Sequence, residues 1–149
     1  MSLTVIIPVK NEENLILNTL IEFQNSWLIN IDHEIIIVND NSTDKTKELV
    51  KNSDFDNLNI LLIDNTKVGL GSAIISGINN SSKQLVGIFM ADMSDNLNDL
   101  KKYYEKMRND NTLDAIFGSR FIKDSKITNY PKFKFLLNRI ANNFIKIIF

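Results

Sequence analysis

Residues 34–46 read Glu-Ile-Ile-Ile-Val-Asn-Asp-Asn-Ser-Thr-Asp-Lys-Thr, and this stretch decides the fold class of the chain. Residues 35–38 form an uninterrupted apolar run, which is typical of a strand buried on both faces. The polar residues that follow favour a turn, and residues 42–44 supply candidate caps for a helix around residues 45–51. The stretch therefore predicts a buried strand that leads through a short polar turn into a helix.

The same alternation of apolar runs and helix-like stretches continues on both sides. Asn11 is a candidate helix cap, with Glu12 and Glu13 in the first turn, where acidic side chains are favoured. Further helices are predicted from Gly69-Leu70-Gly71-Ser72 onward and over residues 97–108, and further strands at residues 3–7, 60–63, 85–90 and 115–117. Continuous apolar strands joined by helices predict an α/β fold with a mainly parallel, open, Rossmann-like sheet and helices on both faces.

Composition excludes several functional classes. The 149 residues suit one domain, and the net charge of -1 provides no global field for nucleic acid. The absence of cysteine excludes a disulfide scaffold, a thiolate zinc site and a cysteine nucleophile. The apolar run at residues 3–7 lacks a basic lead-in and ends at Pro8, so it predicts a strand and not a signal peptide. We therefore expect a cytoplasmic protein.

Ligands of open parallel sheets bind at the carboxyl ends of the strands, so the residues after each strand are the candidate site. Carboxylates there can hold a divalent cation, and Arg120 can pair with a phosphate in a bidentate way. This inventory suits a nucleotide diphosphate with a metal ion. The candidates at these positions are Pro8, Asn11, Glu12, Asp40, Lys67, Gly69, Asp92, Asp95 and Arg120.

Each candidate also has a simpler, structural interpretation. Asp40 is a common turn residue, and Asp92 and Asp95 flank a helix start, where acids stabilise the helix dipole anyway. Gly69 can belong to a close-packed helix start, and Lys67 can be a solvated loop lysine. Their joint occurrence along one edge of the sheet favours the functional interpretation.

The motifs resemble those of the family 2 inverting glycosyltransferases with the GT-A fold, most of all the dolichol-phosphate mannose synthase and polyprenyl-phosphate sugar transferase branch. They run in the family's order and cover nearly the whole chain up to about Phe121. The motifs are Val-Ile-Ile-Pro-Val-Lys-Asn-Glu-Glu at 5–13, the stretch 34–46, Gly-Leu-Gly-Ser-Ala at 69–73, Met-Ala-Asp-Met-Ser-Asp at 90–95 and Phe-Gly-Ser-Arg-Phe at 117–121.

The resemblance implies a role for each position. Asp40 would contact the base or ribose, although Asn39 stands where the family often has a first acid. Asp92 matches the second acid of the family's Asp-x-Asp metal motif, and Met90 replaces the first. The metal would be Mg²⁺ or Mn²⁺, with Asp95 as a second ligand. Arg120 would face the diphosphate, and Pro8, Asn11 and Glu12 would line the nucleoside pocket. Lys67 and Gly69 complete the candidates for donor binding.

The implied activity is transfer of a sugar, with inversion, from a UDP- or GDP-sugar to a polyprenyl or dolichyl phosphate or to a glycan. Residues 1–124 would form the nucleotide-sugar-binding core. Residues 125–149 are basic, with apolar side chains near helical spacing, which predicts an amphipathic helix. That helix would pack on the sheet, or it would meet a membrane surface on the acceptor side and place the protein peripherally on the cytoplasmic face. The apolar end of the sequence raises the expectation of a truncated or short family member.

Two other functions stay open at this point. A nucleotidyltransferase would be expected to carry a glycine-rich, basic loop after the first strand, where Pro8-Val9-Lys10-Asn11-Glu12 stands instead. A non-catalytic nucleotide-binding or membrane-docking module would keep Asp40 and Arg120 but would show no sugar transfer.

Overall fold

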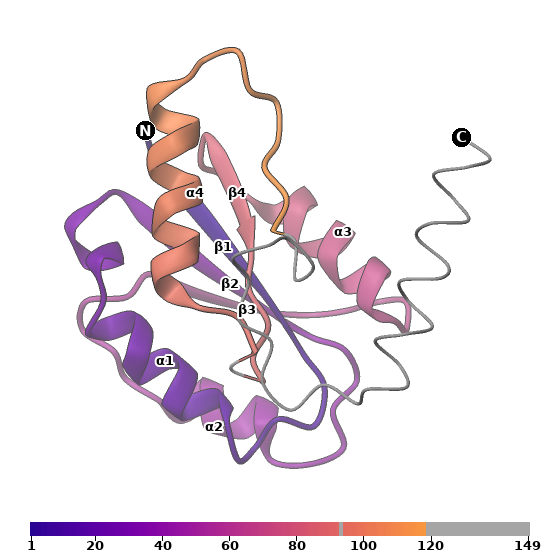
Figure 1. Ribbon diagram of the computed structural model, residues 1–149. Coiled ribbons are helices and arrows are strands. Elements are labelled where there is room, and N and C mark those ends of the chain that lie inside the picture. Colours follow the sequence, from indigo (N-terminus) through magenta and orange to yellow (C-terminus); the bar gives the residue numbers. More distant parts are fainter. Residues whose placement is uncertain (93, 119–149) are drawn as a thin grey trace, which may run out of the picture. The chain divides into compact units, whose positions relative to one another are not determined.

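The computed structural model of the chain describes residues 1–92 and 94–118. Within them lies a parallel sheet with the strand order β3-β2-β1-β4 (Figure 1). The strands are β1 (Leu3–Val9), β2 (His33–Asn39), β3 (Ile60–Asp64) and β4 (Leu85–Ile88). The helices are α1 (Ile16–Gln24), α2 (Thr46–Asn52), α3 (Leu70–Asn80) and α4 (Leu97–Asn109), with a 3-10 turn, η1, at Trp27–Asn30. The predicted α/β fold is confirmed.

Helices cover both faces of the sheet, as the apolar strands predicted. On one face, α1, α2, α4 and η1 enclose the larger core, which includes Ile7 of β1, Phe23 of α1 and Tyr104 of α4. Trp27 packs on Tyr104, with ring centroids 5.2 Å apart. On the other face, α3 packs against β1 and β2 around Ile6. The central strands β1 and β2 are therefore buried on both sides.

Gly77 brings α3 unusually close to the sheet. A Cβ atom at this position would lie 2.5 Å from Cγ2 of Ile6 in β1. Since real Cβ atoms do not approach other carbons so closely, a larger residue would push the helix away from the sheet. The close approach fixes where the first turn of α3 stands relative to the ends of the strands.

Pro8 fits inside β1 because of the length of its neighbour. The carbonyl of Ile6 accepts a hydrogen bond from Phe89 on the β4 side, and the carbonyl of Val9 accepts one from Asp40 on the β2 side. The backbone N–H and C=O groups of successive residues point to opposite sides of a strand, so the backbone nitrogen of Pro8 faces β4, which ends at Ile88. The missing N–H of Pro8 therefore lies beyond the β4 ladder, where no strand partner needs it.

A buried carboxylate ties the sheet together at its amino end. Glu34, only 8% exposed, accepts hydrogen bonds from Thr4 Oγ1 (2.6 Å) and from the N–H (2.6 Å) and Oγ (2.7 Å) of Ser82. Burial by itself raises the pKa of Glu34, but these hydrogen bonds outweigh burial and hold the pKa below its ordinary value. Glu34 thus joins β1 and β2 to the loop between α3 and β4.

Two local predictions are wrong. The strand predicted at residues 115–117 is absent, and these residues have no regular structure. A run of three apolar residues is too short to specify a strand without a pairing partner. Asn11 does not cap a helix, because α1 begins only at Ile16 and Asn11 adopts a left-handed conformation with φ 58°. Its side chain is used by another loop instead, as described below.

The chain divides into two units, Met1–Asp114 and Ala115–Phe149. The predicted amphipathic helix over residues 125–149 lies outside the described residues. Among residues 1–92 and 94–118, no helix has the length and apolar character needed to cross a bilayer.

We predict that Gly77→Ala lowers the free energy of unfolding measured by urea denaturation. The overpacking penalty of about 1–3 kcal/mol exceeds the gain of about 0.5–1 kcal/mol that alanine brings to a helix interior. Gly71→Ala in the same helix is the matched control, because a Cβ there meets nothing within 4 Å. A Gly77→Ala variant as stable as Gly71→Ala would contradict the close contact with Ile6.

We also predict that Glu34 makes the stability depend on pH. Its folded pKa lies below the ordinary value, so its contribution is fully present above about pH 4.5 and is lost as the pH falls through the folded pKa. Glu34→Gln should lose about 2 kcal/mol of unfolding free energy at neutral pH. Urea denaturation across the acid range should show this difference shrinking, and a difference that stays constant in acid would refute the assignment.

Candidate active site at the carboxyl edge of the sheet

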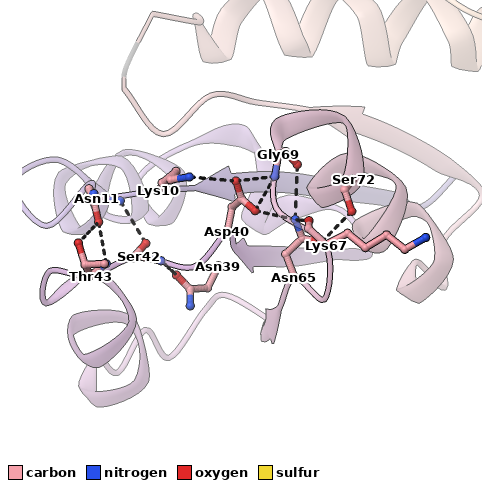
Figure 2. Close-up of polar contacts among 10 residues, drawn as sticks. All are labelled: Lys10, Asn11, Asn39, Asp40, Ser42, Thr43, Asn65, Lys67, Gly69 and Ser72. Atoms are coloured by element: carbon pink, nitrogen blue, oxygen red, sulfur yellow. Dashed lines mark hydrogen bonds and ion pairs between the residues drawn. The ribbon is translucent and has the colours of Figure 1, made fainter.

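Asp40 directly follows β2 and is held by the loop that follows β3 (Figure 2). The N–H of Gly69, the residue before α3, lies 3.0 Å from each of its carboxylate oxygens. The Nδ2 of Asn65 donates to its Oδ1 at 2.7 Å. The carboxylate therefore occupies the amino end of α3, where a negative charge is favoured, and Gly69 provides the φ of 124° that this turn needs.

The charged form of Asp40 is the stable form at neutral pH. Asp40 is only 5% exposed, and burial by itself raises the pKa of its carboxyl group. Hydrogen bonds from Gly69 and Asn65 outweigh burial, and the Lys10 ammonium, 3.9 Å from Oδ2, adds to them. The pKa of Asp40 consequently lies below its ordinary value.

The loop after β1 is fastened to the loop after β2 by Asn11 (Figure 2). The Asn11 N–H donates to Ser42 Oγ at 3.1 Å, and its Oδ1 accepts from the N–H of Thr43 at 2.8 Å. Asn41 shares the left-handed conformation of Asn11, with φ 57°. Asparagine is among the few residues that adopt this conformation readily, which explains why it stands after both strands.

The acids next to Asn11 strengthen the same junction. Asp44 accepts hydrogen bonds from the N–H groups of Thr46 (2.9 Å) and Glu13 (3.1 Å). The N-cap position of α2 is Lys45 and not one of the predicted residues 42–44, but Asp44 still bonds the first N–H of the helix. The Glu13 carboxylate accepts a hydrogen bond from the N–H of Lys45 at 3.0 Å, and the N–H of Glu12 donates to Thr46 Oγ1 at 2.8 Å. The loops after β1 and β2 therefore form one hydrogen-bonded unit, within which Glu12 and Glu13 serve a loop and not the first turn of α1.

Negative charge gathers where the loops after β1 and β4 approach each other. The pKa of Glu12 lies above its ordinary value because burial, and then the charges of Asp92 and Asp44, disfavour its ionised form. Asp92 is exposed, and its Oδ1 accepts from the N–H of Ser94 at 3.0 Å. A cation at this place would relieve the repulsion between the carboxylates.

The turn after β4 positions the two predicted metal ligands. Asp95 Oδ2 accepts from the N–H of Met90 at 2.8 Å, and Thr19 Oγ1 of α1 donates to the carbonyl of Ala91 at 3.0 Å. Among residues 1–92 and 94–118, no three acidic or histidine side chains converge as a ready-made metal site. Mg²⁺ commonly binds through one or two carboxylates together with substrate phosphates, so Asp92 and Asp95 suit an ion that is completed by its substrate.

The other predicted site residues differ in whether their side chains are free to contact a ligand at this edge. Pro8 is buried inside β1, and the N–H of Gly69 is already bonded to Asp40. Lys67 is exposed, and Figure 2 shows its side chain extending away from Asp40. Arg120 lies outside the described residues. Sequence reasoning did not select Asn65, whose only signal was its position directly after β3.

Residues 4–148 match the family model described as Glycosyl transferase family 2. The chain belongs to this family. It is 32% identical over 143 residues to the dolichol-phosphate mannosyltransferase of Pyrococcus furiosus, which covers 95% of the chain and 39% of that protein. It is 37% identical over 90 residues to glycosyltransferase GlyA of Streptococcus pneumoniae, which covers 60% of the chain and 13% of that protein. The chain thus spans less than half of these relatives.

Solved structures show the same fold. The crystal structure of S. aureus TarS 1-349 matches with a TM-score of 0.62 at 22% identity, over 73% of this chain and 33% of that one. The mannosyltransferase PcManGT of Pyrobaculum calidifontis, in complex with GDP-Man and Mn²⁺, matches with a TM-score of 0.55 at 26% identity, over 60% of this chain and 27% of that one. The family predicted from the motifs is confirmed.

We predict that Asn11→Ala destabilises this edge more than Asn11→Gly. Alanine loses the bonds to Thr43 and is disfavoured at positive φ, whereas glycine loses only the bonds. The unfolding free energy from urea denaturation should fall by about 1–2 kcal/mol for alanine and by about half as much for glycine. The reverse order would show that Asn11 is not held in the left-handed conformation.

Proposed function

We propose that this chain carries the donor-binding part of a glycosyltransferase that takes a sugar from a nucleoside diphosphate. The family supports the reaction class. The complex of the similar PcManGT with GDP-Man and Mn²⁺ supports a nucleotide-sugar donor and a divalent cation. The observation that carries the proposal is that the loops after the four parallel strands share one edge of the sheet, where Asp40 is held ionised and Asp92 raises the pKa of Glu12.

The donor would lie across this edge with its nucleoside toward Asp40 and its diphosphate toward Asp92. Asn11 and Glu12 stand on the loop after β1, between these two acids in the sheet order. This placement follows the general rule that open α/β sheets bind ligands beyond the carboxyl ends of their strands. The predicted contact of Arg120 with the diphosphate is part of the proposal.

Asp92, with Asp95, would hold Mg²⁺ or Mn²⁺ together with the diphosphate. Both residues are oxygen donors, which these ions prefer, and each keeps a second carboxylate oxygen that the described residues do not bond. When bound, the ion stabilises the negative charge that develops on the β-phosphate as the bond to the sugar breaks. The nearby carboxylate of Glu12 adds to the negative charge that favours cation binding.

We propose inversion at the sugar and a phosphate group of a polyprenyl or dolichyl lipid as the acceptor, with a glycan as the alternative. The mannosyltransferase of Pyrococcus furiosus, whose name contains dolichol phosphate, supports the lipid. A phosphate acceptor is already ionised and attacks without a strong general base, whereas a hydroxyl needs a carboxylate base. A membrane surface then becomes the natural partner, and the basic residues 125–149 are the candidates to meet it.

The test is calorimetric titration of the full chain with UDP and with GDP, each with Mn²⁺ and with a chelator. We predict metal-dependent binding of one nucleotide, and at least about a tenfold loss in Asp92→Ala, because an ion held through few protein ligands depends on each of them. Asp56→Ala, an exposed carboxylate in the loop between α2 and β3, is the control and should bind like the wild type.

Two outcomes would contradict the proposal. If neither nucleotide binds, the proposed donor site is wrong. If Asp92→Ala and the wild type bind with equal affinity, Asp92 is not a metal ligand. Release of free sugar from the bound donor, or its transfer to a polyprenyl phosphate, separates an enzyme from a non-catalytic binding module.

A further inference from the structure

The side chain of Asn65 is the most heavily used polar group at the candidate site. It is 5% exposed, and its Nδ2 donates to Asp40 Oδ1, to the carbonyl of Lys67 and, at 3.4 Å, to the carbonyl of Gly69 (Figure 2). Its Oδ1 accepts from Ser72 Oγ at 3.1 Å. The amide thus contacts the end of β2, its own loop and the first turn of α3.

These contacts are directional. At neutral pH, the amide of Asn65 presents a donor toward Asp40 and an acceptor toward Ser72 at the same time. The Asp40 carboxylate and the carbonyls of Lys67 and Gly69 can only accept, so they fix Nδ2 on their side and leave Oδ1 to accept from Ser72. The backbone N–H of Asn65 also donates to the carbonyl of Asn39 at 2.9 Å, which fixes the main chain at this point.

We propose that Asn65 is a positioning residue for donor binding. Its amide holds the Asp40 carboxylate and the turn at residues 67–69 in the arrangement that receives the nucleoside. This inference rests on the proposed function, because it assigns the nucleoside to the Asp40 end of the edge. Asn65 acts through Asp40 and the turn and is not assigned a contact with the reacting atoms.

The geometry explains why loss of the Asn65 amide would weaken binding of the nucleoside. Without Nδ2, the buried Asp40 carboxylate loses its Asn65 donor, and the carbonyls of Lys67 and Gly69 lose theirs. A buried carboxylate with fewer partners moves toward water or toward another donor. The turn that carries Gly69 then no longer has a single position.

The experiment compares Asn65→Ala with Thr4→Val in the full chain. Thr4→Val also removes a buried hydrogen bond, to Glu34, but at the amino end of the sheet, far from the site along β1. We expect both variants to lower the unfolding free energy. Only Asn65→Ala should raise the Kd for UDP or GDP, by about tenfold for the loss of one charge-assisted hydrogen bond, while Thr4→Val stays within about twofold of the wild type.

A pH series separates positioning from packing. Asn65→Asp sets a second carboxylate against Asp40, and two such groups favour sharing one proton. The charged groups that face the introduced carboxylate are Asp40 and the Lys10 ammonium. In acid, the introduced carboxyl group becomes a donor to Asp40, so the binding deficit relative to the wild type should shrink. Asn65→Ala introduces no group that could become a donor, so its deficit should not shrink over the same pH range.

The outcomes distinguish this inference from the proposed function. If the wild type binds neither nucleotide, the proposed function fails and the inference falls with it. If the wild type binds and Asn65→Ala binds equally well, the inference alone is overturned. If Asn65→Ala does not fold, Ser72→Ala decides: we expect about a threefold rise in Kd from losing one neutral hydrogen bond, and an unchanged Kd would overturn the inference.

Discussion

The arrangement of the carboxyl edge depends on the buried carboxylate of Asp40. A buried charge is stable only when its oxygens are bonded, and here the donors come from Gly69 and Asn65 on the loop after β3. This requirement joins the end of β2 to the start of α3, while Gly77 holds the same helix against β1. The shape of the turn before α3 and the charge at the amino end of that helix therefore depend on the bonds of Asp40.

A second constraint is the excess of negative charge beside it. Burial, and then the charges of Asp92 and Asp44, raise the pKa of Glu12 above its ordinary value. Hydrogen bonds and Lys10 hold the pKa of Asp40 down, whereas, among the described residues, burial and neighbouring acids raise the pKa of Glu12. The edge is thus divided into a satisfied end and an unsatisfied end, which matches a ligand with a neutral nucleoside and an anionic, cation-binding diphosphate.

The sequence was sufficient where the signal is local. Continuous apolar runs predicted strands β1 to β4, and the polar turn after β2 and Gly69 predicted approximately where α2 and α3 begin. It failed where the deciding partner is distant: Asn11 serves the loop after β2, and Asn65 serves Asp40. The strand expected at residues 115–117 failed for a different reason, because so short an apolar run does not determine its own pairing. The positions of the strand ends identified the candidate acids. Only the structure shows which of these carboxylates already accept hydrogen bonds from the protein.

The most direct test of the account is a map of nucleotide binding on backbone amides. The ¹⁵N-labelled full chain would be titrated with UDP and with GDP in the presence of Mg²⁺, and chemical-shift changes followed by NMR. The account predicts that the changes centre on the amides of Asn11, Glu12, Asp40 and Gly69 and on the turn after β4, with the amides of Glu34 and Ser82 unaffected. Changes centred instead on the hollow between α2 and β3, lined by Lys47, Lys51 and Asp64, would contradict the assignment of the carboxyl edge as the donor site.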